Sequence, residues 1–396
     1  MKQRITLFIF VFFAINWLSA QNIAVSGILD SSVSLQAGAG NSPNFSYGIE
    51  EYANLRMQAK LRDRVTFYGA VNFIAAFGSY AMIAARTAEL STYAAGENYI
   101  AAIELERLYF RLNGEAIGFD GGLLRLPFGY GQVWGSSDFL NPKNPLKPGA
   151  RPRAVLGAGL AWYPTGELKL LTFGAAPRNP FSSKGQGTIA GLTMDQHWNK
   201  GSLQLLYSFE SPKDGSNQGI HRAGISVKAD VEVGLVMDAL YTYNSEAKTK
   251  HDGLSFSFGA DYSFFDGDLI VLAEYLYNGK TSSTAYGYGG SFSNEHYLYT
   301  SLTWRFNNYT NISAVLISGL SDISFTPVIT LNHDLFQGVT LILTAQIPLD
   351  RDLFSGDGRR GELGPLPPDE LQFQLPITGE RIGRYFDFTA TLRLRF

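Results

Sequence analysis

The sequence predicts an all-β protein that folds as a single transmembrane, antiparallel, up-and-down β-barrel. Three observations point to this fold class: long segments in which apolar and polar residues alternate, connections that alternate between short and long, and a first segment typical of exported proteins. Alternation with a period of two is strand spacing, because successive side chains leave a strand on opposite faces.

The first twenty residues have the layout of a secretory signal peptide. Lys2 and Arg4 precede an uncharged apolar run over 5–18, and the small residues Ser19 and Ala20 follow it. A retained anchor helix is the alternative, but the run is shorter than the roughly 20 residues that span a bilayer. We therefore expect a signal peptide over 1–20, cleaved after Ala20, and a barrel over 21–396.

The composition agrees with an exported membrane protein. The 396 residues include no cysteine, so neither a disulfide framework nor a thiolate metal site is available. Charged residues make up 17% of the chain, compared with roughly 25% in ordinary soluble domains. The formal net charge of −3 gives no reason to expect nucleic acid as a partner.

About eighteen segments fit the period-two pattern, and we take 16 to 18 strands as the range. Many are longer than the five or six residues usual in soluble sheets and reach the 9 to 11 needed to cross a bilayer at a tilt. An even number of strands returns both chain ends to the periplasmic side. The predicted strands are 23–38, 47–61, 64–78, 98–113, 116–126, 153–163, 167–176, 186–199, 201–211, 218–231, 233–244, 251–265, 268–279, 293–306, 309–320, 323–333, 338–348 and 382–396.

The third of these strands has a helical alternative. Residues 65–85 include no charged side chain, and the segment is long enough for a transmembrane helix. Apolar residues alternate as far as Phe77, however, and two glycines and an asparagine interrupt the run. We predict a strand there, followed by a short helix at 80–90 inside a longer connection.

The connections alternate in length along the chain. Short turns follow the even-numbered strands up to the fourteenth, whereas the other set holds every long connection: 79–97, 127–152, 280–292 and 349–381. Short periplasmic turns and long outer loops are typical of outer-membrane barrels. A soluble two-sheet sandwich, the main alternative, gives no reason for this alternation.

The chain ends in a strand with one apolar face. Leu392, Leu394 and Phe396 are expected to face lipid, while Arg393 and Arg395 face the lumen. Terminal strands that end in phenylalanine resemble the insertion signal read by the outer-membrane assembly machinery of diderm bacteria. This resemblance implies that machinery and outer-membrane lipid as partners, and the outer membrane as location.

The connection 127–152 contains the stretch WGSSDFLNP, which resembles a feature of porin-like barrels of the alginate-export type. It follows a strand that ends with Arg125, and it implies porin-like architecture. The residues that carry the resemblance are Trp134, Gly135, Asp138, Leu140, Asn141 and Pro142.

The same connection is rich in proline and basic residues. Prolines restrict the chain, so the segment can keep one inward-folded shape at lower entropic cost. We expect it to narrow the pore; a loop that only caps the rim is the alternative. The candidate constriction residues are Arg125, Asp138, Lys143, Lys147, Arg151 and Arg153, facing Glu104 and Glu106.

A barrel of this size leaves a wide interior. We therefore expect a channel for diffusion of small hydrophilic solutes, with a weak preference for anions because basic residues are in excess at the constriction. In the alternative, these charges pair and only pin the loop. A closed barrel acting as a surface adhesin or structural protein is the second hypothesis.

No enzymatic, metal or cofactor motif was found. The histidines show no pair at metal-ligand spacing, and G-x-S-x-G is absent, so we expect neither an enzyme nor a metal or cofactor site. The long connection 349–381 is expected to be an exposed outer loop, serving either surface recognition or solvated cover. The histidines are His197, His221, His251, His296 and His333.

Overall fold

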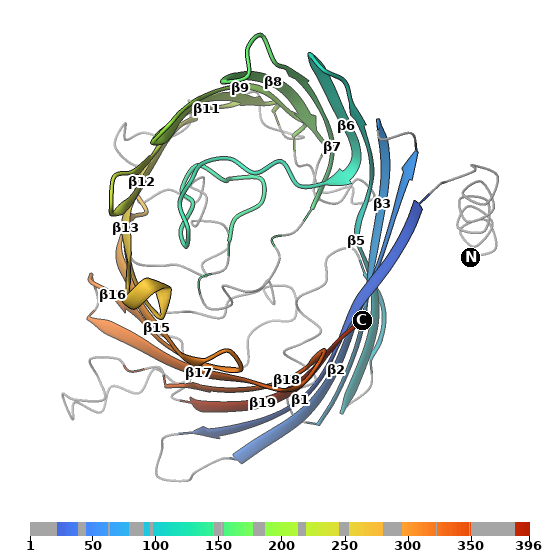
Figure 1. The fold of residues 1–396 in the computed structure, drawn as a ribbon, viewed down its shortest axis with the longest axis vertical. Helices are drawn as coiled ribbons and strands as arrows, with labels where there is room; N and C mark the ends of the chain where they lie inside the picture. Colours follow the sequence, from blue (N-terminus) through green and yellow to red (C-terminus); the bar gives the residue numbers. More distant parts are fainter. Residues whose placement is uncertain are drawn as a thin grey trace.

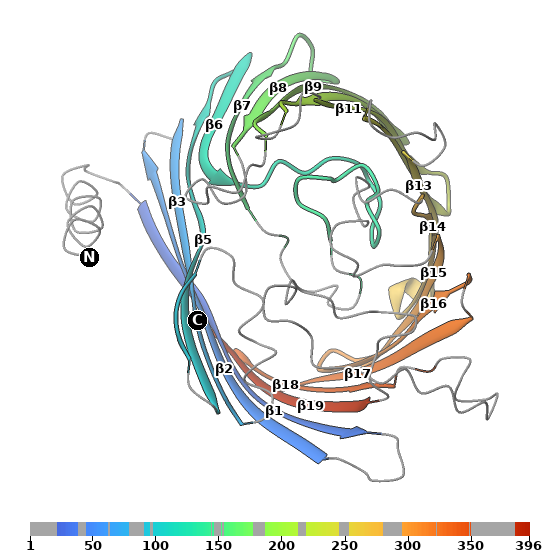
Figure 2. The ribbon, with the colours of Figure 1, turned by 180° about the vertical axis from the view of Figure 1, so that it is seen from behind.

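A computed structural model shows a closed 18-strand antiparallel β-barrel (Figures 1 and 2). The structure describes residues 22–38, 45–61, 64–78, 91–95, 98–143, 145, 152, 154–176, 187–212, 219–244, 253–279, 295–321, 323–347, 349 and 385–396. Eighteen strands form the wall, in which each pairs with the wall strands before and after it and the last pairs with the first. A nineteenth, short strand pairs, within these described ranges, with one wall strand only. Closure leaves the wall without a free edge, as a sheet in lipid requires.

The strands agree with the predicted ones within about four residues at each end, so the predicted fold class is confirmed. They are β1 (Asn22–Gly38), β2 (Phe45–Leu61), β3 (Val65–Gly78), β4 (Ser91–Ala95), β5 (Tyr99–Asn113), β6 (Ile117–Leu124), β7 (Val155–Trp162), β8 (Leu168–Ala175), β9 (Ile189–Trp198), β10 (Gly201–Glu210), β11 (Ile220–Asp230), β12 (Gly234–Asn244), β13 (Leu254–Phe264), β14 (Leu269–Tyr277), β15 (His296–Asn307), β16 (Thr310–Gly319), β17 (Ser324–Phe336), β18 (Val339–Gln346) and β19 (Tyr385–Arg395).

One strand was missed by the sequence prediction. β4 lies in the connection predicted to be a loop, and it pairs with β5 over residues 100–104. β6 pairs with β5 only over 108–113, so the adjoining part of that edge is open to β4. The helix predicted at 80–90 lies outside the described residues. β3 is a strand, as predicted, and no helix in the described part of the chain is long and apolar enough to span a membrane.

The two faces of the wall follow the period-two pattern. Apolar and aromatic side chains point outward and are exposed on the barrel's surface, among them Leu392, Leu394 and Phe396 at the C-terminal strand. Inward-facing positions of β19 carry Arg393, which donates two hydrogen bonds of 2.7 Å to the carboxylate of Asp30 on β1. The closing seam is therefore apolar outside and ion-paired inside.

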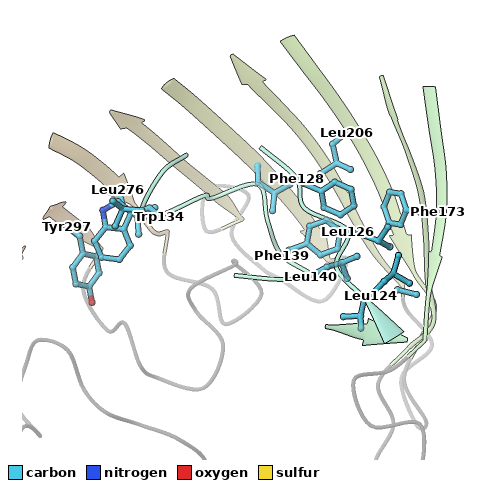
Figure 3. Packing of buried hydrophobic residues seen from close by; sticks show 14 of the residues in the cluster. Leu124, Leu126, Phe128, Trp134, Phe139, Leu140, Phe173, Leu206, Leu276 and Tyr297 are labelled. Carbon is cyan, nitrogen blue, oxygen red and sulfur yellow. The ribbon is translucent and has the colours of Figure 1, made fainter. Parts of the chain in front are cut away.

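After β6 the chain leaves the wall and turns into the barrel interior (Figure 1). We call residues 125–143 the inner loop. Its apolar side chains form a cluster with inward-facing residues of the wall, and two groups can be followed in Figure 3. Phe128 lies 4.8 Å from Phe173 between ring centroids, and Trp134 lies 5.3 Å from Tyr297. The main hydrophobic core thus lies inside the barrel, between loop and wall.

A β-bulge in β5 brings two consecutive side chains to the lumen. The register against β3 shifts between Ala70 and Val71, which pair with Arg107 and Leu105 and leave Glu106 as the extra residue. A bulge of this kind places neighbouring residues on one face. Glu106 and Arg107 consequently face the lumen together, with 3.4 Å between Oε1 and Nε.

Candidate functional site

The inner loop is bound to the wall through its backbone. Six consecutive N–H groups, from residue 129 to residue 134, donate hydrogen bonds to three wall side chains. Gln204 on β10 accepts one, Asp238 on β12 accepts two and Glu274 on β14 accepts three, with N···O distances of 2.7 to 3.0 Å. We call these three residues the loop anchor.

Burial makes the loop anchor strong. Asp238 and Glu274 are 0% and 1% exposed. A carboxylate taken out of water is costly unless hydrogen-bond donors replace the lost water, and bonds to a charged acceptor are stronger than neutral ones. The five N–H groups that meet these two carboxylates supply those donors. The wall thus holds the loop through its backbone N–H groups.

Glycine is required where the loop passes closest to the wall. Gly129 has a φ of +79°, and a Cβ at this position would lie 2.5 Å from Oδ2 of Asp238. Any side chain would therefore strain the backbone and push the loop away from its anchor. The sequence GYG at 129–131 fits this close approach.

Loop side chains add further contacts to the same strands. The indole Nε1 of Trp134 donates to the carbonyl of Glu274 at 3.2 Å. The hydroxyl of Ser136 donates to the carbonyl of Asp238 at 3.0 Å. Ser226 on β11 donates to Ser137 at 3.1 Å. Backbone and side chains together fix the loop across β10 to β14.

The predicted motif residues fold the loop onto itself. The amide oxygen of Asn141 accepts the N–H of Leu126 at 2.9 Å, and Asp138 accepts the N–H of Asn141 at 3.0 Å. Burial raises the pKa of the Asp138 carboxyl well above its usual range, although the bond from Asn141 opposes the shift. Gly135 accepts the N–H of Asp138 at 2.9 Å, Leu140 is buried, and Pro142 is half-buried. The motif therefore lies in the loop and shapes it.

The predicted basic residues have different positions. Arg125 lies 3.1 Å from Glu106 and forms an ion pair at the root of the loop. Lys143 donates to the carbonyl of Gly131 within the loop. Glu104 accepts a hydrogen bond of 2.9 Å from Asn72. Arg125 and Glu106 thus touch directly instead of facing each other across a gap. Lys147, Arg151 and Arg153 lie outside the described residues.

Glu106 is the centre of a polar network on β2, β3 and β5. Its Oε1 lies near Arg107 and Arg125, and its Oε2 accepts a bond of 2.7 Å from Asn54. Asn54 also donates to Asn72 at 2.6 Å. This network lines the wall that follows the closing seam and ties the root of the loop to three strands.

Sequence reasoning missed Gln204, Asp238 and Glu274. Each occupies an inward-facing strand position, where a polar residue is expected in a barrel of this size. For Asp238 and Glu274, the available signal was limited to one acidic residue on a strand whose other inward positions are small or apolar; Gln204 gave no such signal. No group of three histidine, aspartate or glutamate side chains within the described ranges could hold a metal ion.

No protein-family model and no curated protein matches the chain. Solved structures do. OccK9 (OpdG) of Pseudomonas aeruginosa is similar with a TM-score of 0.57 at 10% identity, covering 95% of this chain and 99% of its own. OccK5 (OpdH) of the same organism has a TM-score of 0.56 at 10% identity, and the match covers 95% of this chain and 99% of OccK5. OccAB4 of Acinetobacter baumannii has a TM-score of 0.54 at 9% identity, and the match covers 96% of this chain and 100% of OccAB4. At such identities the likeness shows the fold, a porin-like barrel.

Proposed function

We propose that this protein is an outer-membrane channel through which small hydrophilic solutes diffuse. The observation that carries the proposal is that the inner loop is docked on one side of a closed wall. On the other side, inward-facing polar residues of β17, β18 and β19 stay partly exposed, including Thr330, Thr344 and Thr391. Polar side chains that keep solvent contact inside a barrel are typical of a water-filled lumen.

We also propose that the protein is located in the outer membrane. The apolar outer surface needs lipid, and the predicted signal peptide and terminal phenylalanine support export to the outer membrane of a diderm bacterium. The fold likeness to OccK9 and OccAB4 supports a barrel of porin architecture. The similarity of 134–142 to barrels of the alginate-export type remains a prediction.

The experiment is reconstitution into planar bilayers, with folding checked on the same sample by the heat-dependent shift of barrel mobility in gel electrophoresis. We expect stepwise conductance in potassium chloride from folded protein. Folded protein without conductance would leave the closed adhesin or structural barrel as the better hypothesis.

A weak anion preference is a finer part of the proposal. It rests on the excess of basic residues on and beside the inner loop. Arg125 is paired with Glu106, so Arg151 and Arg153 are the residues chosen for the test. Replacing both with glutamate should move the reversal potential toward cations in a salt gradient. Arg111→Gln is a suitable control, since Arg111 is already paired with Asp120 at 2.7 Å. An unchanged reversal potential in the double variant would mean that these arginines have no part in selectivity.

A further inference from the structure

Six hydroxyl residues stand in one register row across six adjacent strands. The pairing of neighbouring strands places Ser34 opposite Thr389, and Thr389 opposite Thr344. It continues through Thr330 and Ser313 to Thr303 on β15. We call these six residues the hydroxyl row: Ser34, Thr389, Thr344, Thr330, Ser313 and Thr303. No local pattern shows the row, because its members come from strands up to 355 residues apart.

Neighbouring members of the row are bonded in pairs. Ser34 and Thr389 lie 2.9 Å apart, Thr330 and Thr344 lie 3.3 Å apart, and Thr303 and Ser313 lie 3.1 Å apart. A hydroxyl offers one donor and two acceptor positions. Each pair uses one position per residue, and Thr389 also donates to the carboxylate of Asp387 at 3.3 Å, so every member of the row keeps capacity for a further partner. All members except Ser34 keep partial solvent exposure. The row therefore presents orderly, partly used hydroxyl groups to the lumen.

The row runs along the pore as well as around it. Six strands at about 4.8 Å spacing make it roughly 24 Å long. Because barrel strands tilt by about 35–45°, a line perpendicular to them climbs roughly 15 Å along the pore axis. A solute that crosses the barrel can thus stay in contact with the row over much of its path.

The side chains beside the row are mostly neutral. On one side lie Ser32, Thr391 and the hydrogen-bonded pair Asn311 and Asn332, whose amides are 3.0 Å apart. Ser32 and Thr391 are bonded at 2.8 Å. A neutral polyol that gives up water here finds hydroxyl and amide partners in exchange. A charged solute loses a stronger hydration shell, and the six hydroxyl residues offer it no opposite charge. The charges beside the row are one acid and one base, Asp387 next to Thr389 and Arg305 next to Thr303.

We propose that the solutes of this channel are neutral and polyhydroxylated, of the sugar type, and that the hydroxyl row is their track through the pore. This inference rests on the proposed channel function and adds the substrate class. The row replaces part of the solute's hydration by successive short-lived hydrogen bonds, so passage favours solutes with several hydroxyl groups.

The test compares sugar entry with ion flow in one protein. The variant carries Thr330→Val, Thr344→Val and Thr389→Val, which keep the side-chain shape and remove the hydroxyls. The control carries Thr66→Val and Thr242→Val, two inward-facing threonines of β3 and β12 outside the row. The readouts are swelling of proteoliposomes in D-glucose and in glycine, which has no hydroxyl group, and conductance in potassium chloride.

We expect glucose-driven swelling of the row variant to slow by roughly two- to tenfold, the factor equivalent to one net hydrogen bond. Glycine-driven swelling, conductance and the control variant should stay near the unsubstituted protein. An unchanged ratio of glucose to glycine entry would overturn the inference while leaving the channel intact. Absence of conductance in the folded, unsubstituted protein would instead contradict the proposed function itself.

Discussion

In two parts of the same barrel, the inward-facing polar side chains obtain their hydrogen-bond partners in different ways. Across β10 to β14, the wall carries buried Asp238 and Glu274, and the inner loop saturates them with backbone N–H groups. Across β15 to β19 and β1, the wall carries neutral hydroxyls that pair with each other and stay partly exposed. Buried acidic side chains hold a segment in place because their burial without donors is costly, whereas hydroxyl groups that are partly exposed can still bond a further partner.

The difference indicates a division of labour within the lumen. The anchored side is fixed by bonds that link residues more than 100 positions apart. On the side of the hydroxyl row, the hydroxyl groups are already hydrogen-bonded to each other, so little hydrogen-bond energy is lost when a solute leaves. In the channel that we propose, the pore lies between an anchored face and a face of partly exposed hydroxyl groups.

The largest effect is expected from Glu274→Ala, because it removes half of the backbone hydrogen bonds through which the loop anchor holds the inner loop on the wall. Glu274→Ala deletes three bonds to a charged acceptor, each worth about 1.5–3 kcal/mol. The loop should detach, trypsin should cut the folded barrel after Arg125 or Lys143, and conductance should rise. Glu104→Ala is the matched control, because Glu104 holds Asn72 and no loop backbone. Equal protease resistance of the two variants would show that Glu274 does not hold the loop.

Trp134 tests the apolar part of the same face. Its side chain is fully buried against Tyr297, so Trp134→Ala should lower the free energy of unfolding by about 3–5 kcal/mol. The unfolding midpoint in guanidinium is the measurement. Trp304→Ala, on the outward face and 49% exposed, should cost less in detergent. A larger loss for Trp304 would place the main apolar stabilisation outside the lumen.

The smallest effect is expected at the closing seam. Asp30 and Arg393 form a two-bond ion pair whose side chains are partly exposed. In a double-mutant cycle with Asp30→Asn and Arg393→Gln, we expect a coupling of about 1 kcal/mol, because solvent screens the pair. The more exposed pair Arg111 and Asp120 should give less. A larger coupling energy for Arg111 and Asp120 than for Asp30 and Arg393 would mean that the position of the latter pair at the closing seam does not strengthen it.

The sequence predicts the position of the inner loop and some of its internal hydrogen bonds, but not the wall residues that bind it. The prolines and the motif at 134–142 indicate an inward segment with its own hydrogen bonds, and Asn141 and Asp138 supply some of them. The ion pair of Arg125 with Glu106 depends on a bulge, which shifts the face of one residue and leaves no clear trace in the alternation. The partners of the loop backbone belong to strands whose register the sequence does not state.

The sequence by itself determined the all-β class, the strand positions, the even strand number and the outward apolar face. Each of these depends on local alternation and turn length, which a chain displays within about fifteen residues. Only the tertiary structure decided that β4 joins the sheet, that Asp238 and Glu274 hold the inner loop, and that six hydroxyls form one row. These features depend on register between strands, and register is set when the whole sheet closes and every backbone group finds its partner.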